Sequence, residues 1–367
     1  MKRRIGILTG GGDCPGINAV IRSIAKKSIL EYDTEVIGIL DGYDGLIHDR
    51  HRMLHYDDVS GILTLGGTIL GTSNTANPYR HPVRKGDSLE FEDASQTTIT
   101  NIKNLNIDCL VCIGGDGTLS IAYQLFRDGI PVVGVPKTID NDLRGTDITF
   151  GFDSAVMTAT EGIDKLHTTA QSHHRVMIVE VMGRNAGWIA LHAGVAGGAD
   201  ILLIPEIPYD IDVIVEKVKD RNRKGKRFSI LVVAEGAKPK GGNVVVQRVV
   251  KDSTDPIRLG GISFVLGSQI EGMTDIETRV VVMGHLQRSG VPTPFDRVLA
   301  TKLGCKAVEM IAKGRFGYMV GVEGNSLVEV LLDDVAQGPR NIPLDDPLIQ
   351  AARFVGTCFG DKPDSMV

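Results

Sequence analysis

The feature that most constrains the fold is a pattern that recurs along the chain. A short β-branched apolar run leads into a glycine-rich turn and then into a segment with helical periodicity, at residues 3–27, 108–126 and 175–196. Residues 228–242 and 130–142 each add an apolar strand that ends in a glycine turn or a polar loop. Continuous apolar strands that alternate with helices are typical of an α/β fold, in which helices cover both faces of a parallel sheet. Ligands of such sheets bind at the carboxyl ends of the strands, where these turns lie.

Composition narrows the class of protein. With 367 residues, 42% of them hydrophobic and 23% charged, the chain is long enough for a core divided between two domains. A net charge of -5 argues against a nucleic-acid binder, and no apolar run approaches the roughly 20 residues that span a bilayer. The N-terminal MKRRIGILTGGGD lacks the apolar core of a signal peptide and is predicted to form the first strand.

The cysteines and three further segments give local predictions. Five cysteines, an odd number, fit a reducing cytoplasm, and Cys109 and Cys112 are predicted to be buried thiols on opposite faces of one strand. A helix is expected near residues 153–171, between two α/β lobes. The basic stretch 221–227 is interpreted as a solvated helix end and loop, and the chain is expected to fray from about Asp361.

Two glycine turns follow predicted strands, where backbone N–H groups and a helix N-terminus can face a phosphate. One contains Gly10, Gly11 and Gly12, and the other places Gly114, Gly115 and Gly117 around Asp116. Neither matches the Walker pattern or the dinucleotide-binding spacing, and each signal is weak alone. Asp116 is more informative, because a carboxylate in a phosphate-binding loop repels the anion unless a cation such as Mg²⁺ lies between them.

Three more loops carry charged side chains at predicted strand ends. Residues 136–142 (PKTIDND) place Asp140 and Asp142 two residues apart, which suits a general base and a second acidic group; an Asx turn with capping aspartates is an equally good interpretation of this loop alone. Residues 182–188 contain Arg184, and residues 284–290 contain His285 and Arg288 between glycines. Together the loops supply groups for a sugar phosphate, for Mg²⁺ and for proton transfer.

The motifs GGGDCPGINA, GGDGT, PKTIDND, SHHR, MGRNAG, AEG, ETR and GHLQRSG closely resemble the 6-phosphofructokinase family, in its order and spacing from residue 5 to about residue 300. The resemblance implies a fold of two Rossmann-like α/β lobes with mainly parallel sheets and an active site in the cleft between them. It implies a donor lobe of 1–151 plus about 287–335, and a fructose 6-phosphate lobe of 152–286 plus about 336–367. It also implies a cytoplasmic homotetramer or homodimer with shared active sites.

The resemblance assigns a role to each matched position. The donor phosphates are expected at Gly11, Gly12, Asn74, Gly115, Asp116, Gly117 and Thr118, with Mg²⁺ on Asp116. The expected catalytic residues are Asp140 as base, Thr138 beside the transferring phosphoryl group, Lys137 and Arg184. The expected substrate-binding residues are Thr138, Ile139, Asp140, Met182, Gly183, Arg184, Glu235, His285, Leu286, Gln287 and Arg288, with Arg175 and Arg279 reaching the 6-phosphate from a neighbouring subunit.

Two positions depart from the pattern of the bacterial ATP-dependent members of the family. Asn74-Thr75 stands where those members carry Arg-Phe, and that arginine bridges donor and acceptor phosphates. Lys137 occupies a position that is Gly in the commonest bacterial ATP enzymes and Lys in pyrophosphate-dependent ones, whereas Gly117 is of the ATP type. The chain thus resembles an intermediate group that pairs Gly with Lys.

The expected function is therefore that of a glycolytic ATP-dependent 6-phosphofructokinase. Such an enzyme transfers the γ-phosphoryl group of ATP to the 1-hydroxyl of fructose 6-phosphate and forms fructose 1,6-bisphosphate. A pyrophosphate-dependent phosphotransferase with the same acceptor is the nearest alternative. A weakened sugar-phosphate-binding regulatory subunit is the alternative outside the enzymes, favoured only by Asn74.

Overall fold

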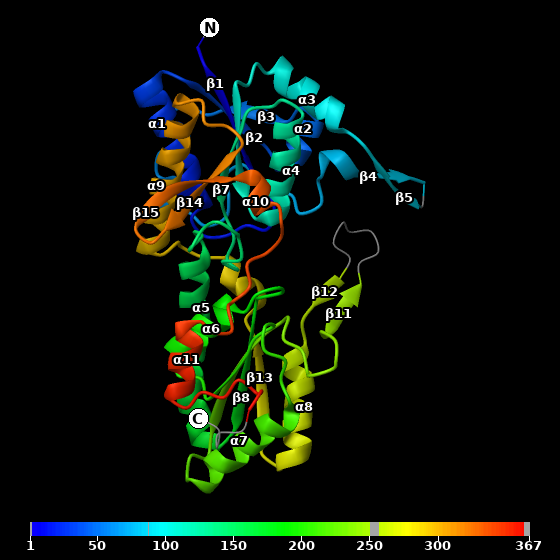
Figure 1. Ribbon diagram of the computed structural model, residues 1–367, viewed down its shortest axis with the longest axis vertical. Coiled ribbons are helices and arrows are strands. Elements are labelled where there is room, and N and C mark those ends of the chain that lie inside the picture. Colours follow the sequence, from blue (N-terminus) through cyan, green and yellow to red (C-terminus); the bar gives the residue numbers. More distant parts are fainter. Residues whose placement is uncertain (1, 87, 250–256, 363–367) are drawn as a thin grey trace. The chain divides into compact units, whose positions relative to one another are not determined.

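The computed structural model describes residues 2–86, 88–249 and 257–362. The chain divides into two compact units, and each is described by itself. Among the described residues, unit 1 comprises 2–154 and 288–339, and unit 2 comprises 155–249, 257–287 and 340–362. The predicted α/β class is confirmed, because each unit contains a mainly parallel sheet with helices on both faces (Figure 1).

Unit 1 is organised around a seven-stranded sheet with the order β15-β14-β7-β6-β1-β2-β3. Its strands are β1 (Arg4–Thr9), β2 (Glu35–Ile39), β3 (His51–Met53), β6 (Cys109–Gly114), β7 (Val132–Pro136), β14 (Tyr318–Glu323) and β15 (Ser326–Leu331). The β2–β3 and β14–β15 pairs are antiparallel, and the remaining neighbours are parallel. The predicted first strand is confirmed as β1.

Helices cover both faces of this sheet (Figure 1). On one face α1 (Ile17–Tyr32) packs against α9 (Pro294–Ala312). On the other face lie α2 (Tyr43–Ile47), α3 (Ser95–Asn104), α4 (Asp116–Arg127) and α10 (Leu332–Val335), over a core that includes Leu8, Leu110 and Leu119. Burial on both faces explains why β6 and β7 are apolar throughout.

A two-stranded hairpin of β4 (His81–Lys85) and β5 (Ser88–Glu92) lies outside the large sheet of unit 1 and extends away from it (Figure 1). It follows two short 3-10 helices, η1 (Ile62–Thr64) and η2 (Pro78–Arg80). Sequence analysis did not predict this hairpin, because its alternating polar side chains are largely exposed and give no apolar strand pattern.

Unit 2 contains a four-stranded parallel sheet with the order β13-β8-β10-β9. Its strands are β8 (Val176–Val181), β9 (Ile201–Leu203), β10 (Ser229–Ala234) and β13 (Thr278–Val282), and a separate antiparallel hairpin joins β11 (Val246–Val249) and β12 (Ile257–Leu259). The helices are α5 (Phe152–His173), α6 (Trp188–Ala196), α7 (Ile211–Arg223), α8 (Ile262–Thr274) and α11 (Pro347–Phe354), with the 3-10 segment η3 (Gly284–Arg288) crossing the boundary between the units.

The helices of unit 2 again lie on both faces of their sheet. On one face, α7 and α8 enclose a core that contains Ile178, Leu231 and Leu266. On the other face α6 packs against α11, and His167 of α5 lies 2.7 Å from the carbonyl oxygen of Gly197. The helix expected near residues 153–171 is confirmed as α5.

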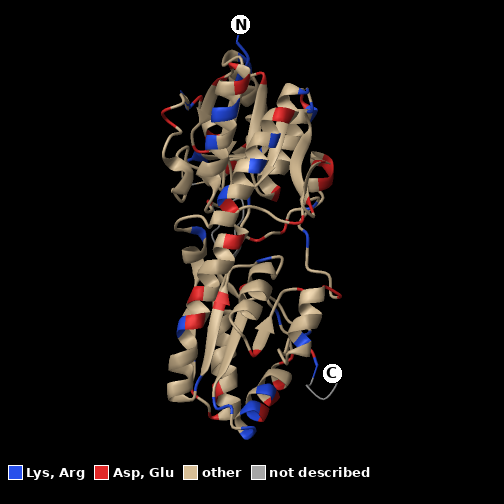
Figure 2. Ribbon diagram, turned by 90° about the vertical axis from the view of Figure 1, so that its left-hand side faces the viewer, with Lys and Arg blue, Asp and Glu red and all other residues tan. Residues whose placement is uncertain are grey.

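The remaining local predictions also have outcomes. Cys109 and Cys112 are buried on β6 and form no disulfide with any described residue, and burial raises the pKa of Cys112 to about 12. The basic stretch is a helix end and loop as predicted, since α7 stops at Arg223 and residues 222–227 are exposed (Figure 2). The prediction of a solvated stretch is wrong for Arg221, which is 20% exposed and pairs with Asp200 at 2.7 Å. The prediction that the chain frays from about Asp361 is wrong for Asp361 itself, because its carboxylate accepts two hydrogen bonds from Arg353 at 2.9 and 2.8 Å. Residues 363–367 lie outside the described part of the chain.

No helix among the described residues is both long enough and apolar enough to cross a bilayer.

Candidate active site

Three loops of unit 1 follow adjacent parallel strands. They come after β1, β6 and β7, which pair in the order β7-β6-β1, so their carboxyl ends share one edge of the sheet. The chain leaves β1 toward β2 on one side, and β6 lies on the other side. This is the reversal of strand order at which open α/β sheets bind ligands.

The loop after β1 is held in place by its neighbours. Gly10 N–H donates to the Ile113 carbonyl at 3.0 Å, and Gly11 N–H donates to the Ser73 carbonyl at 3.1 Å. Gly11 has a φ of +76°, and a Cβ at Gly10 or Gly12 would lie 2.6 Å from Thr118 Oγ1 or Arg288 Nη1. Glycine is therefore favoured at position 10 by the close approach of Thr118 and at position 11 by its positive φ, and the Gly11 N–H is already used within the protein.

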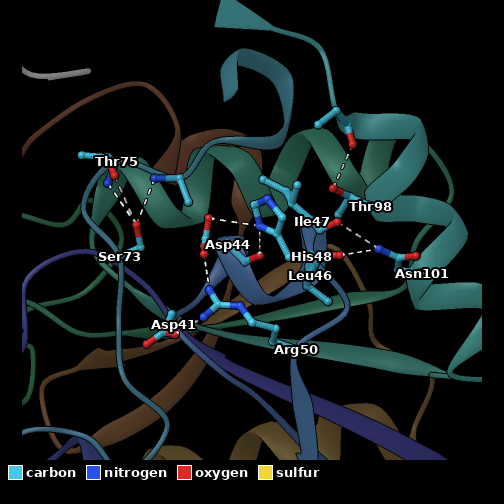
Figure 3. Close-up of polar contacts among 12 residues, drawn as sticks. Asp41, Asp44, Leu46, Ile47, His48, Arg50, Ser73, Thr75, Thr98 and Asn101 are labelled. Atoms are coloured by element: carbon cyan, nitrogen blue, oxygen red, sulfur yellow. Dashed lines mark hydrogen bonds and ion pairs between the residues drawn. The ribbon is translucent and has the colours of Figure 1, made fainter. Parts of the chain in front are cut away.

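The segment with Asn74 is attached to this loop, because Thr72 Oγ1 donates to the Gly11 carbonyl at 2.6 Å. Ser73 Oγ in turn accepts hydrogen bonds from the backbone N–H groups of Thr75 and Ala76 at 3.3 and 3.1 Å (Figure 3). Asn74 itself is exposed. Through Thr72 and Ser73 the segment that contains Asn74 is therefore attached to the β1 loop.

The loop after β6 leads directly into α4. Gly115 is the N-cap, and Asp116 is the first helical residue, exposed at the positive end of the helix dipole. A Cβ built at Gly117 would have no described heavy atom within 4 Å. Thr118 is different: it is buried against Gly10 and Gly114, and its carbonyl accepts a hydrogen bond of 2.7 Å from Tyr43.

The loop after β7 contains Lys137, which is only 4% exposed. Its Nζ donates to the Gly12 carbonyl and so links β7 to the β1 loop. Burial lowers the pKa of Lys137, and the positive charge of Arg288 lowers it further. Arg288 donates to the Asp13 carbonyl at 3.2 Å, so this residue, which the resemblance assigns to the sugar phosphate, lies against the β1 loop.

Two carboxylates of the β7 loop have raised pKa values. Burial is the main cause for Asp140, opposed by the charges of Arg288 and Lys137 and reinforced by that of Asp116. Asp140 Oδ1 is buried and has no hydrogen-bond partner among the described residues. Burial also raises the pKa of Asp142, and the charge of Asp140 adds to this effect.

Thr138 orders the same loop. Its Oγ1 accepts a hydrogen bond from the Asp140 backbone N–H at 3.1 Å and lies 3.5 Å from Asp142 Oδ1. The Asx-turn interpretation of this loop does not explain Asp140, whose carboxylate has an oxygen with no partner in the described structure. Ile139 is fully buried, so only its backbone can reach a ligand.

In unit 2 a second set of predicted residues lies along one edge of the sheet. Met182, Gly183 and Arg184 follow β8, Glu235 follows β10, and His285 follows β13, and these three strands are adjacent and parallel. Two of the loops touch, since Gly236 N–H donates to the Gly183 carbonyl at 3.1 Å. His285 and Leu286 are exposed, whereas Gln287 is fully buried.

Arg175 and Arg279 lie at the opposite end of the same strands. Arg175 immediately precedes β8, and Arg279 is the second residue of β13, with Arg279 and Met177 in register. A strand of six residues separates Arg175 from Met182; at 3.3 Å per residue this is roughly 20 Å. One chain therefore does not bring these arginines to the edge where Met182 and His285 lie.

Sequence analysis missed Glu277, which holds the two arginines together. Glu277 pairs with Arg175 Nε through one carboxylate oxygen and with Arg279 Nη2 through the other. The contact with Arg175 is the main reason why the pKa of Glu277 is lowered. Two guanidinium groups share one carboxylate, so the cluster keeps a net positive charge. Glu277 stands two residues before Arg279 in the ETR motif, which was the available signal.

Sequence analysis also missed Glu206, which lies after β9 and fixes the turn that follows β8. Its carboxylate accepts hydrogen bonds from the N–H of Gly187, the N-cap of α6, at 3.1 and 3.2 Å and from the Ile342 N–H at 3.0 Å. Burial raises the pKa of Glu206. This residue was not found because its partners are distant in the sequence.

Comparisons with known proteins identify the family of the chain and agree with its fold. A family model described as phosphofructokinase matches residues 4–311. The chain is 52% identical over 361 residues to ATP-dependent 6-phosphofructokinase 2 of Clostridium perfringens, covering 98% of this chain and 99% of the relative. It is 48% identical over 340 residues to pyrophosphate–fructose 6-phosphate 1-phosphotransferase of Amycolatopsis methanolica, covering 93% and 96%.

Among solved structures, the phosphofructokinase of Pichia pastoris in the T-state has a TM-score of 0.80 and 31% identity. The match covers 97% of this chain and 37% of that one. The fold and the two sets of sheet-edge residues define an α/β phosphotransferase. The chain belongs to the phosphofructokinase family, which confirms the resemblance seen in the sequence motifs.

Proposed function

We propose that this phosphofructokinase transfers the γ-phosphoryl group of ATP to the 1-hydroxyl of fructose 6-phosphate. The observation that carries the proposal is the meeting of three loops at one edge of the unit 1 sheet. There, Asp116, Lys137 and Asp140 are close enough for the charges of the other two to shift the pKa of Asp140. A metal-binding carboxylate, a cation and a base are the groups that phosphoryl transfer without a covalent intermediate requires.

The residues at this edge fit Mg²⁺. Carboxylate oxygens are the hard ligands that Mg²⁺ prefers, and Asp116 is exposed at the start of α4, where it can share the metal with donor phosphates. Asp140, whose buried Oδ1 has no hydrogen-bond partner among the described residues, is a second acidic group close enough to Asp116 for their charges to interact. When bound there, Mg²⁺ would neutralise negative charge on the donor phosphates.

Proton transfer is proposed for Asp140. In its ionised form, Asp140 accepts the proton of the acceptor's 1-hydroxyl as the new O–P bond forms, while the bond between the γ-phosphorus and the bridging oxygen breaks and ADP leaves with the electron pair of that bond. Its raised pKa makes it a stronger base than an ordinary aspartate, while Lys137 and Arg288 keep the ionised form accessible. Lys137, Arg288 and Arg184 are proposed to stabilise the negative charge of the transferring group.

ATP is the preferred donor in this proposal, because the space at Gly117 is open. Pyrophosphate is the second candidate. It is favoured by Lys137, which adds a buried cation beside the donor loop, and by the activity for which the Amycolatopsis relative is named.

The acceptor is proposed to bind at the unit 2 edge, through Met182, Gly183, Arg184, Glu235 and His285. Because Arg175 and Arg279 lie at the far end of the same strands, we propose that they serve the 6-phosphate site of a neighbouring subunit. A homotetramer or homodimer with shared sites follows from that proposal. We also propose a cytoplasmic, glycolytic role, for which the buried unpaired thiols Cys109 and Cys112 are a supporting observation.

The test is a coupled assay of fructose 1,6-bisphosphate formation with ATP or pyrophosphate as donor. Turnover with ATP, dependent on Mg²⁺ and on fructose 6-phosphate, supports the proposal. If the enzyme turns over with pyrophosphate but not with ATP, then pyrophosphate is the donor, and the proposed acceptor chemistry still stands. Binding of fructose 6-phosphate without turnover from either donor favours the regulatory-subunit alternative.

A further inference from the structure

A cluster of three metal-ligating side chains lies outside the candidate active site, on unit 1. Asp44 belongs to α2, His48 is the C-cap of that helix, and His81 is the first residue of β4. Each offers one ligand atom, and these atoms all lie within 4.8 Å of one another. The His48 and His81 rings meet edge to face, with centroids 5.4 Å apart.

We propose that Asp44, His48 and His81 bind a divalent transition-metal ion of the Zn²⁺ type. Two imidazoles and one carboxylate suit zinc, and they leave a fourth coordination position for water. The site joins α2 to the base of the β4–β5 hairpin. It does not depend on the proposed function, because none of its ligands belongs to the residues that carry phosphoryl transfer.

The spacing of the ligands supports this choice of metal. His48 Nδ1 lies 3.3 Å from Asp44 Oδ1. In a tetrahedral zinc site with bonds of roughly 2.1 Å, neighbouring ligand atoms are separated by about 3.4 Å. His48 Nδ1 also donates to the Asp44 carbonyl oxygen at 3.0 Å, so this hydrogen bond breaks, or Nε2 turns toward the site, when the imidazole coordinates a metal. Rotation of the His48 side chain, which is 51% exposed, can bring its ligand atom closer to those of Asp44 and His81.

The state of His81 is a second, independent observation. Its Nδ1 is buried and has no hydrogen-bond partner in the part of the chain that the structure describes. An imidazole nitrogen without a partner is costly to bury, and a metal ion would satisfy it.

Neighbouring charges set the expected affinity. Arg50 pairs with the other oxygen of Asp44 and lies 2.9 Å from Asp41 Oδ2 (Figure 3). This pairing fixes the Asp44 carboxylate and leaves its Oδ1 directed at His48. Arg50 also neutralises part of the negative charge of Asp44, which would otherwise attract the metal ion. With three ligands and one shared charge, we expect a dissociation constant for Zn²⁺ on the order of 1–10 µM, weaker than in closed four-ligand sites.

The experiment is calorimetric titration of Zn²⁺ into untagged, chelator-treated full-length protein at pH 7.5, with millimolar Mg²⁺ present. Mg²⁺ does not compete, because it prefers oxygen ligands. We expect one Zn²⁺ per chain, a visible absorption band when Co²⁺ is used instead, and a Tm that rises with Zn²⁺ concentration. His81→Ala should weaken binding at least about 30-fold and abolish the Tm rise.

His55→Ala is the matched control, since His55 is an exposed histidine of the same unit outside the cluster. It should bind Zn²⁺ like the wild type. Asp44→Asn, which keeps the shape of the side chain, serves as a second ligand variant if His81→Ala is unstable. No saturable binding by wild type up to 100 times the expected constant overturns the proposal. Binding that is equal in wild type, His81→Ala and Asp44→Asn also overturns it.

Discussion

Substitution of Asp140 by Asn tests two properties of the proposed base separately: its role in proton transfer and its effect on the stability of the fold. The amide keeps the size of the carboxylate and can still accept from nearby donors, but it does not accept a proton from the 1-hydroxyl. We expect kcat to fall on the order of 10²–10⁴-fold, which is about 2.7–5.4 kcal/mol of transition-state stabilisation. The KM for fructose 6-phosphate should change far less, because the groups proposed to bind the acceptor at the unit 2 edge are unchanged in this variant.

The same substitution should not destabilise the fold. Asp140 has a buried oxygen without a described partner, and burial raises its pKa, so folding favours the protonated form. Because the pKa of Asp140 is higher in the folded state than in the unfolded state, ionising this buried carboxyl lowers the free energy of unfolding. This destabilisation is absent at a pH below the unfolded pKa and fully present at a pH above the folded pKa. At pH 8, Asp140→Asn should therefore be as stable as the wild type or more stable, with a gain of roughly 1 kcal/mol.

The pH profile gives a further test of the same assignment. The ionised base is needed, so kcat/KM for the wild type should decline as pH falls through the pKa of Asp140. Because that pKa is raised, the decline should begin at a higher pH than an ordinary aspartate would give. The residual activity of Asp140→Asn should lack this decline.

Asp142→Asn is the matched control, two residues further along the same loop. Asp142 is 8% exposed and its Oδ1 faces Thr138, so its loss should lower kcat much less than the loss of Asp140. The assay is initial velocity with a coupled readout, together with thermal unfolding of both variants. An Asp140→Asn enzyme that keeps more than about a tenth of wild-type kcat would refute general base catalysis by Asp140.

Three other expectations test the site. Gly117→Asp should lower kcat/KM for ATP at least about 100-fold and raise the relative preference for pyrophosphate, measured with both donors; unchanged ATP use would show that position 117 does not select the donor. Arg279→Ala should raise the KM for fructose 6-phosphate, and mixing it with Asp140→Asn subunits should restore activity; hybrids that form without a gain exclude a shared site. Glu206→Ala should raise that KM several-fold with a smaller effect on kcat, whereas Glu206→Gln, which keeps an acceptor for the Gly187 N–H, should recover most of the loss; equal defects would assign Glu206 to folding alone.

The elements that could be predicted from the sequence are those whose signal is local. Apolar strands such as β6 and β10, and the glycine turns that follow β1 and β6, are visible in a few consecutive residues because each strand is buried on both faces. The strand ends then locate Asp116 and Asp140 at a ligand-binding edge. This inference needs only the rule that neighbouring parallel strands end at the same edge.

Contacts between distant parts of the chain could not be predicted in this way. Glu206 accepts a hydrogen bond from the Ile342 N–H, which is 136 residues away in the sequence. The ligand atoms of His81 and Asp44 lie within 4.8 Å of each other, although the η1 and η2 segments lie between these residues in the sequence. No periodicity or spacing connects these residues, because their proximity depends on how separate elements pack. The β4–β5 hairpin was missed for a related reason, since an exposed two-stranded hairpin has no buried face to impose an apolar pattern.

The packing of Lys137 also changes how donor selection should be studied. From the sequence, Lys137 is a cation beside the leaving phosphates. In the structure its ammonium is buried and donates to the Gly12 carbonyl, so it also fixes the loop that follows β1. Substituting Lys137 would therefore disturb the conformation of the donor loop together with the charge, and a change in donor preference could not be assigned to either cause. A Cβ at Gly117 would have no described heavy atom within 4 Å, so a side chain placed at position 117 tests donor choice without breaking a contact of this kind.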